Sequence, residues 1–479
     1  MKRFVKSLVF FFALIPFFLF AQTPNSGFTN AGNYGFSPNA TGMENVHALQ
    51  KAVDVGGTII VSQSGTYNLA GTVYIGSNTT LEFGNGVFIK KVIENGPYSH
   101  VFLNKGAGTK QYNEHISIIG LNIIVNGVDV RMFKEAYGLH GQLAFFYVKD
   151  LNIRQFRCLD VGTQQYAIQV CTFEDLIIDD VIIKGLKDGV HLGRGKRFSI
   201  RNGVFQTYDD AIALNAADYS TGNPELGWIE NGVVENCHDL IADKAVGFFC
   251  RIIAGAWLDW TPGMKVQQSD AVVSNGRIYR VQANPDGKIY TSNTQPIHES
   301  GKMELDGIKW GVVQTDTIHT CGVRNVIFRN IFLEKPRVSF SIHFDNDKFS
   351  RNYYPGAQIP MQEQITLENI RVLHNKMIPL LNIATPVDVV TISNSSIRNN
   401  SIVFTDKKAM TNHLKTIINI YGCVFNQKQP MELLKNNIDG KEIFLKTFGN
   451  VELYKGFEAK IIPNKGNITV DSDLTGLRK

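Results

Sequence analysis

Short apolar segments recur along this chain at a fixed interval. The four-residue segments that begin at Ala167, Gly189 and Ala211 start 22 residues apart and carry apolar side chains at the same two positions. Residues 176–178 and 198–200 repeat with the same spacing. A fixed repeat of about 20 to 50 residues indicates a solenoid, in which each turn buries its face against its neighbours. Because longer helical segments with a 3.6-residue period are missing, the pattern predicts an all-β fold, a right-handed parallel β-helix.

The alternation of apolar and polar residues extends beyond these repeats in both directions. Further strands are expected within residues 115–130, 144–153, 325–333, 364–372, 387–397 and 416–425. Residues 43–55 form the best amphipathic helix pattern in the chain, and they precede the first expected strand at residues 58–61. Since a stacked fold must cover its open ends, we expect this helix to be an N-terminal cap.

The repeat is interrupted between residues 256 and 315. Three of the four tryptophans lie in this segment, and residues 269–310 resemble the small carbohydrate-binding modules attached to chitinases. Aromatic rings can stack on the apolar face of a sugar, so Trp257 and Trp260 are candidate substrate-binding residues. The same cluster would equally form the miniature core of a small domain. Either way, the segment predicts a small inserted β subdomain.

The first residues have the layout of a secretory signal. Lys2, Arg3 and Lys6 precede an apolar run at residues 7–20, and a polar stretch follows Ala21. A membrane anchor is the alternative, but the run is short for a full span and contains a proline. We therefore expect a signal peptide at residues 1–21 and a secreted or periplasmic mature protein without a membrane anchor.

The composition narrows the class of protein further. With 479 residues, 44% hydrophobic and 19% charged, the chain can bury a large core and is not disordered. The net charge of +5 falls to +2 without the three charges of the basic tip, so there is no electrostatic case for nucleic acid as a partner. The six cysteines have no zinc spacing and are expected to be buried free thiols, with one or two disulfides as the alternative. No cofactor is expected.

The repeat also predicts where acidic side chains meet. Adjacent turns of a β-helix lie about 4.8 Å apart, so Asp188 and Asp210, which are 22 residues apart, should be stacked neighbours. Asp209 lies beside them, and alternation along the strand turns His191 outward near the same acids. Crowding raises the pKa of at least one carboxyl and so provides a proton donor and a proton acceptor at the same pH. This pair of groups can break a glycosidic bond, whereas a calcium site or turn-capping aspartates are the alternatives.

Two motifs around these aspartates resemble those of glycoside hydrolase family 28, which contains the polygalacturonases. The chain keeps the Asp-Gly of the family's Asn-Thr-Asp-Gly motif at Asp188 and the Asp-Asp of its second motif at Asp209 and Asp210. The resemblance covers residues 40–255 and 316–400. It implies an inverting hydrolase in which Asp209 is the general acid and Asp188 and Asp210 hold and activate water.

The chain departs from the family at two further motifs. No clear Gly-His-Gly is present, although residues 246–251 fall where it belongs, and the expected Arg-X-Lys is replaced by Ser341-Ile342-His343. A serine and a histidine do not reproduce the grip of arginine and lysine on a sugar carboxylate. Recognition of a carboxylate is therefore left open. We take His191, Arg251 and His343 as candidate substrate-binding residues and predict no metal site.

The leading hypothesis is an exported inverting glycoside hydrolase acting on a plant or algal, pectin-like polysaccharide or an oligosaccharide from it. The alternatives are a polysaccharide lyase on the same fold and a carbohydrate-binding protein without catalysis. The expected domains are a signal peptide (1–21), the N-terminal cap and β-helix (22–255), the insert (256–315), and the remaining β-helix with a C-terminal cap (316–479). The sequence leaves the identity of the sugar and the oligomeric state open.

Overall fold

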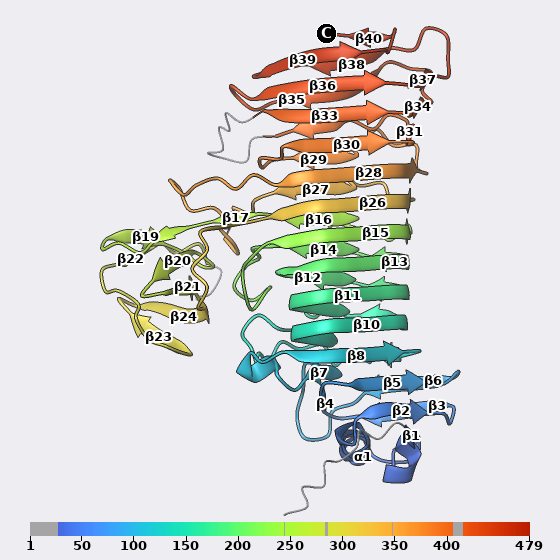
Figure 1. The fold of residues 1–479 in the computed structure, drawn as a ribbon, viewed down its shortest axis with the longest axis vertical. Coiled ribbons are helices and arrows are strands. Elements are labelled where there is room, and N and C mark those ends of the chain that lie inside the picture. The colour runs from blue at the N-terminus through green and yellow to red at the C-terminus, as the bar shows by residue number, and fades with distance from the viewer. Residues whose placement is uncertain (1–26, 244, 283–285, 347, 406–414) are drawn as a thin grey trace, which may run out of the picture.

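The computed structural model describes residues 27–243, 245–282, 286–346, 348–405 and 415–479. The strands stack coil upon coil along one long axis, from the blue N-terminal end to the red C-terminal end in Figure 1. The expected signal peptide lies outside the described residues. Within the part that is described, no helix has both the length and the apolar character needed to cross a membrane.

Parallel strands form ladders that run the length of the stack. One ladder consists of β1 (Phe28–Asn30), β2 (Gly57–Val61), β5 (Thr79–Phe83), β8 (Asn113–Ile119), β10 (Leu143–Val161), β11 (Ile168–Gly185), β13 (Gly195–Thr207), β15 (Ile229–Asp239), β26 (Val323–Leu333), β28 (Glu363–Val372), β30 (Val389–Ser393), β33 (Thr416–Tyr421), β36 (Glu442–Phe448) and β39 (Asn467–Ser472). The long strands of this ladder continue into another one. That ladder is completed by β3 (Gly65–Leu69), β6 (Val87–Lys91), β9 (Asn122–Ile124), β31 (Ser396–Ile397), β34 (Val424–Phe425) and β37 (Val451–Glu452).

A ladder of short strands carries the residues of interest for function. It consists of β4 (Val73–Ile75), β7 (Phe102–Asn104), β12 (Val190–Leu192), β14 (Ile212–Asn215), β16 (Cys250–Ile253), β27 (Phe340–His343), β29 (Leu381–Ile383), β32 (Ile402–Phe404), β35 (Met431–Asn436), β38 (Ala459–Ile462) and β40 (Leu477–Arg478). The starts of β10 and β11 also pair within it.

The register of the stack confirms the predicted repeat. Ile168 pairs with Val190, and Val190 pairs with Ile212, so each coil is offset by 22 residues from the last. These three side chains are fully buried. Alternation along each short strand therefore sends one set of side chains into the axial core and the other set outward, as in a right-handed parallel β-helix.

The N-terminal end of the stack is covered by η1 (Ala31–Tyr34) and α1 (Gly42–Asp54), as Figure 1 shows. Thr41 and Glu44 form a reciprocal capping box at the start of α1, which satisfies amide groups that have no partner within the helix. The apolar face of α1 is buried, with Leu49 and Ala52 inaccessible to solvent. The predicted capping helix is therefore confirmed.

Residues 255–321 leave the stack and form small sheets of their own at its side (Figure 1). Their strands are β17 (Gly255–Ala256), β18 (Leu258–Asp259), β19 (Met264–Val266), β20 (Ala271–Ser274), β21 (Arg277–Val281), β22 (Tyr290–Ser292), β23 (Lys302–Leu305), β24 (Ile308–Gln314) and β25 (Thr320–Cys321). A separate cluster of buried apolar residues around Trp310 forms the core of this insert. The Gln314 side chain joins the insert to the stack through two hydrogen bonds with the backbone of Leu226. All six cysteines are buried and free.

Candidate active site

The turns that lead into β12 and β14 carry the three predicted aspartates. Asp188 precedes β12, and Asp209 and Asp210 precede β14 on the next coil. The Gly189 amide donates a hydrogen bond of 3.0 Å to the Asp210 carbonyl, which holds the two turns in register. One carboxylate oxygen of each aspartate lies within 4.8 Å of the others. The repeat therefore brings these acids together as expected.

The three carboxylates differ in their access to solvent. The side chain of Asp209 is 23% exposed, whereas those of Asp188 and Asp210 are 3% and 1% exposed. Among the described residues, Asp188 Oδ1 and Asp210 Oδ2 are buried without a hydrogen-bond partner. Asp209 is therefore the member of the cluster that can touch a large ligand. The two inner oxygens can accept hydrogen bonds from a group as small as water.

Two cations neutralise the cluster. Lys187 forms an ion pair with Asp209, and its Nζ lies 3.8 Å from Asp188 Oδ1. Arg251 belongs to the next coil, because β14 pairs with β16, and its Nε lies 3.2 Å from Asp210 Oδ2. Sequence reasoning singled out Arg251 but missed Lys187. Its position directly before an aspartate of the motif was the available signal.

Burial and neighbouring charges separate the pKa values of the three carboxyls. Burial raises the pKa of Asp210 to about 7, although a neighbouring arginine opposes this effect. Burial and then the charge of Asp188 raise the pKa of Asp209, against the opposing charge of Lys187. At Asp188, burial is outweighed by Lys187 and by the hydrogen bond from His191, so this pKa lies well below its ordinary value. The cluster thus contains an ionised carboxylate beside carboxyls that hold protons more readily.

His191 does not contact the solvent, so the prediction that it binds substrate directly is wrong. The side chain is fully buried, with Nδ1 2.8 Å from Asp188 Oδ2 and Nε2 3.3 Å from Asp218 Oδ2. The Tyr166 ring stacks on it at a centroid distance of 3.9 Å. Burial by itself would lower the pKa of His191, but the two carboxylates raise it. The strand does turn this side chain outward, yet the surrounding loops cover it, and it orients Asp188 instead.

Asp218 belongs to the site although no sequence pattern marked it. It lies in the loop after β14 and is buried, with its Oδ2 accepting a hydrogen bond of 3.0 Å from the Asn215 amide. Its Oδ1 lies 3.4 Å from Arg251 Nη2. Asp218 therefore links His191 and Arg251, which lie on different coils. Because this loop has no counterpart in the repeat, only its folding brings Asp218 to the cluster.

A buried ion pair supports the backbone of the proposed acid. Arg337 donates a hydrogen bond of 3.0 Å from Nη1 to the Asp209 carbonyl and another of 3.0 Å from Nη2 to Asp239 Oδ1. Lys335 Nζ lies 3.2 Å from the same Asp239 oxygen. These cations are therefore occupied in holding the turn, and they do not reach the exposed side of the cluster.

A cavity of about 820 Å³ lies beside the cluster. Lys187 and Arg251 line it, and Tyr219 contributes from the loop after β14. Its other walls come from the segment between β9 and β10, the turn before β11, the insert and the segment after β27. Representative side chains from these walls are Arg131, Phe133, Tyr137, Gln164, Gln268 and Phe349. The volume lies within the usual range for small-molecule sites, about 300 to 1,000 Å³.

The two candidate tryptophans have other roles. Trp257 is 2% exposed, and its indole N–H donates a hydrogen bond of 2.7 Å to the Ile318 carbonyl. The prediction that Trp257 stacks on a sugar is therefore wrong, since both faces of its ring are covered. Trp260 packs against the core of the insert, donates to Ser292 Oγ at 2.8 Å, and does not line the cavity. The aromatic cluster is thus largely the miniature core that was the alternative interpretation.

His343 is also buried, at 2% exposure, so the prediction of direct substrate contact is wrong for this residue as well. Its Nδ1 lies 2.8 Å from Ser341 Oγ, and its Nε2 lies 3.2 Å from Asp345 Oδ1. Asp345 lines the cavity and His343 does not. Of the predicted substrate-binding residues, Arg251 is the one that reaches the cavity, with 18% of its side chain exposed.

The three aspartates are close enough together to hold a metal ion. Lys187 and Arg251 already place positive charge against the same carboxylates. A divalent cation there would be repelled by both side chains at short range. The charge balance of the cluster therefore suits proton transfer better than cation binding.

The fold and the site together define the class of protein, a right-handed parallel β-helix with an aspartate cluster beside a cavity in its wall. No protein-family model and no curated protein sequence matches the chain. Similar solved structures include a family 28 exopolygalacturonase from Yersinia enterocolitica (14% identity, 92% of this chain and 78% of that chain covered, TM-score 0.44). Others are an exopolygalacturonase from Thermotoga maritima (12%, 87% and 91%, 0.48) and the Streptococcus pneumoniae surface adhesin PfbA (15%, 95% and 99%, 0.41). At these identities the likeness concerns the fold, and the role of the site is argued below from its geometry.

Proposed function

We propose that this chain is an exported glycoside hydrolase that cleaves a pectin-like plant or algal polysaccharide, or an oligosaccharide derived from one. The observation that carries the proposal is the difference between two neighbouring carboxyls. Asp209 is partly exposed and has a raised pKa, whereas Asp188 is buried and has a lowered pKa. Hydrolysis of a glycosidic bond needs one carboxyl that donates a proton and one carboxylate that accepts a proton from water.

In the proposed reaction, Asp209 donates its proton to the glycosidic oxygen as the bond from that oxygen to the sugar carbon breaks. A water molecule held by Asp188 Oδ1 and Asp210 Oδ2 attacks the same carbon, and its proton passes to Asp188. Asp188 is the better acceptor because its pKa is lowered, which keeps it ionised, whereas Asp210 has a pKa of about 7. Arg251 stays beside the water-holding pair and balances its charge.

We propose inversion at the sugar carbon, as the resemblance to family 28 implies. The closest oxygens of the cluster lie within 4.8 Å of one another, which is nearer to the usual carboxyl spacing of retaining enzymes, about 5 to 5.5 Å, than to the 6.5 to 9.5 Å of inverting ones. Burial decides the choice here, because a carboxylate that is 1% or 3% exposed can hold water but cannot bond to a sugar carbon. Proton NMR of the first product should therefore detect the inverted anomer. A retained anomer would contradict this assignment.

The charge state of the cavity favours hydrolysis over β-elimination. A lyase needs a neutral base to remove a proton from the sugar ring. Burial would lower the pKa of Lys187 and of Arg251, but the surrounding aspartates raise both. These two side chains therefore stay protonated and cannot serve as that base.

The direct test is incubation with a panel of pectic and algal polysaccharides. We expect new reducing ends without the ultraviolet absorbance of an unsaturated product. The Asp209→Asn variant should lose about 10²- to 10⁴-fold in kcat while still binding the substrate, because it removes a proton and hardly changes shape. Asp439→Asn, at an exposed position far along the chain, is the matched control. Unsaturated products would indicate a lyase, and binding without turnover by the natural protein would indicate a carbohydrate-binding protein.

A further inference from the structure

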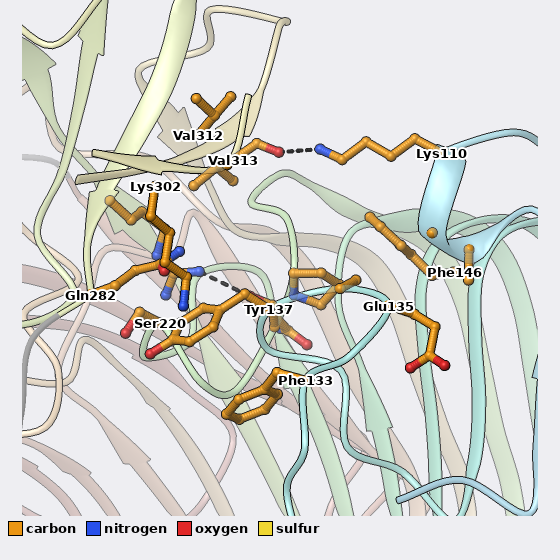
Figure 2. A pocket seen from close by; sticks show the side chains of 17 residues that line it. Lys110, Phe133, Glu135, Tyr137, Phe146, Ser220, Gln282, Lys302, Val312 and Val313 are labelled. Atoms are coloured by element: carbon orange, nitrogen blue, oxygen red, sulfur yellow. Dashed lines mark hydrogen bonds between the residues drawn. The ribbon is translucent and has the colours of Figure 1, made fainter. Parts of the chain in front are cut away.

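A second pocket lies where the insert meets the stack, and we call it the seam pocket (Figure 2). Its volume is about 270 Å³, and its walls come from residues 107–110, 133–137 and 220–224 of the stack and from strands β21, β23 and β24 of the insert. Phe133 and Tyr137 line both the seam pocket and the cavity beside the aspartates. The two spaces therefore share a wall.

Arg280 places a buried positive charge in the seam pocket. It is 2% exposed, and its guanidinium donates to the carbonyls of Asn223, at 3.0 Å, and Asp218. Its Nε has no hydrogen-bond partner, and among the described residues Arg280 forms no ion pair. Burial accordingly lowers the pKa of Arg280 to about 10, although Asp218 opposes this effect. A buried charge without a counter-charge is costly, and an anionic ligand would relieve that cost.

Lys302 adds a second positive charge at the mouth of the pocket. It is exposed, and its Nζ lies 3.9 Å from the centroid of the Tyr137 ring. In Figure 2, Lys302, Gln282 and Tyr137 gather at one side of the pocket. Lys302 forms no ion pair with the described residues. Burial and then the charge of Lys309 lower its pKa. The carboxylate on the opposite side, that of Glu135, already accepts a hydrogen bond of 2.6 Å from the Tyr74 hydroxyl.

The rest of the lining suits a sugar ring. Asn223 Oδ1 and Gln282 Oε1 are buried acceptors without a partner among the described residues, and hydroxyl groups can donate to them. Phe133 and Tyr137 provide aromatic surface for the apolar face of a ring. Since one water occupies about 30 Å³ of liquid, the volume corresponds to about nine waters, which is enough for one sugar unit.

We propose that the seam pocket binds a sugar unit that carries an anionic group, a carboxylate or a sulfate, with that group against Arg280 and Lys302. This binding is independent of hydrolysis, because none of the three aspartates lines the pocket. The shared wall means that one branched or bent oligosaccharide can occupy the seam pocket and the cavity together. The insert would then select substrates by a charged substituent away from the bond that is cleaved.

The test measures binding without turnover, in the Asp209→Asn background, by isothermal titration calorimetry. The probes are a uronate trisaccharide, a sulfated galactose trisaccharide and the neutral galactose trisaccharide. We expect at least one anionic probe to bind about tenfold or more tightly than the neutral one, since a charge-assisted hydrogen bond is worth that much. Comparison of the two anionic probes identifies the carboxylate or the sulfate as the preferred group.

Two variants connect the binding to the seam pocket. Lys302→Gln removes the exposed charge without touching the core, and Gly108→Phe fills the pocket sterically. Gly108 lines the pocket, and a Cβ on it would meet its nearest atom, the Glu135 carbonyl oxygen, at 3.8 Å, so the backbone accepts a side chain. Both variants should weaken binding of the anionic probe about tenfold. Lys288→Gln, an exposed position of the insert outside the lining, changes the net charge equally and should leave binding unchanged.

Full affinity in both Lys302→Gln and Gly108→Phe would overturn the proposal, because any binding would then occur elsewhere. Equal affinity for the neutral and both anionic trisaccharides would also overturn it. These outcomes are distinct from a failure of the proposed hydrolase. That failure appears as absence of cleavage by the natural protein, whatever the calorimetry shows.

Discussion

Replacing Lys187 with methionine tests whether Asp209 and Asp188 act as the acid and the base. The change removes the cation that contacts Asp209 and lies 3.8 Å from Asp188 Oδ1, and it keeps an unbranched apolar side chain of similar length. Asp210 and Arg251 remain in place around the two carboxyls. Without the ammonium group, both carboxyls lose an interaction that favours their ionised forms, so both pKa values rise.

The size of the shift follows from the distances. Two unit charges 3.8 Å apart attract by about 4 kcal/mol at an effective dielectric constant of about 20, which corresponds to about three pKa units. The side chains of Lys187 and Asp209 are 21% and 23% exposed, so solvent screens part of this attraction. We therefore expect a rise of about one to two units for each carboxyl.

The assay is the pH dependence of kcat/KM on an oligosaccharide that the natural protein cleaves. The acid must be protonated and the base ionised, so both limbs of the bell-shaped profile should move to higher pH by about one to two units in Lys187→Met. Lys184→Met, at an exposed lysine of β11 outside the site, should leave the profile in place. If the basic limb stays fixed or moves to lower pH in Lys187→Met, Asp209 is not the proton donor.

Two further predictions concern residues that the structure moved away from the substrate. The pKa of His191 is raised, so its contribution to stability is complete below the unfolded pKa of about 6.5 and is lost as the pH rises through the higher folded value. In urea unfolding, the deficit of His191→Gln should therefore be larger at about pH 5.5 than at about pH 9, and an equal deficit would contradict the charged pairing with Asp188 and Asp218. Trp257→Phe should lower the free energy of unfolding by about 1 to 3 kcal/mol, because the Ile318 carbonyl loses its buried donor. Its KM should stay unchanged, and a raised KM with unaltered stability would restore Trp257 as a binding residue.

The parts of the site that could be predicted are those that share the repeat. Asp188 and Asp210 occupy equivalent places on successive coils, so a spacing of 22 residues was enough to bring them together. Arg251 follows the same logic one coil later, since β16 pairs with β14. The fold class and the capping helix were predictable for a similar reason, because local alternation and capping residues specify them.

The failed predictions have a common physical cause. Alternation along β12 and β27 correctly turns His191 and His343 away from the axial core, but loops then cover both side chains. A loop that covers an outward-facing strand has no period, so its path cannot be derived from spacing. Asp218 was missed for the same reason, and Trp257 was misassigned because composition alone does not show which faces of a ring are covered.

The sequence by itself determined the coiled stack, its register, its N-terminal cap and the meeting of three aspartates, because each of these follows from interactions between residues at short or regular spacing. Only the tertiary structure decided which of those acids is exposed, which cations neutralise them, and how the insert joins the stack to form the seam pocket. Those features depend on contacts between loops far apart in the chain, and burial, which controls both charge and access, exists only once these loops have folded together.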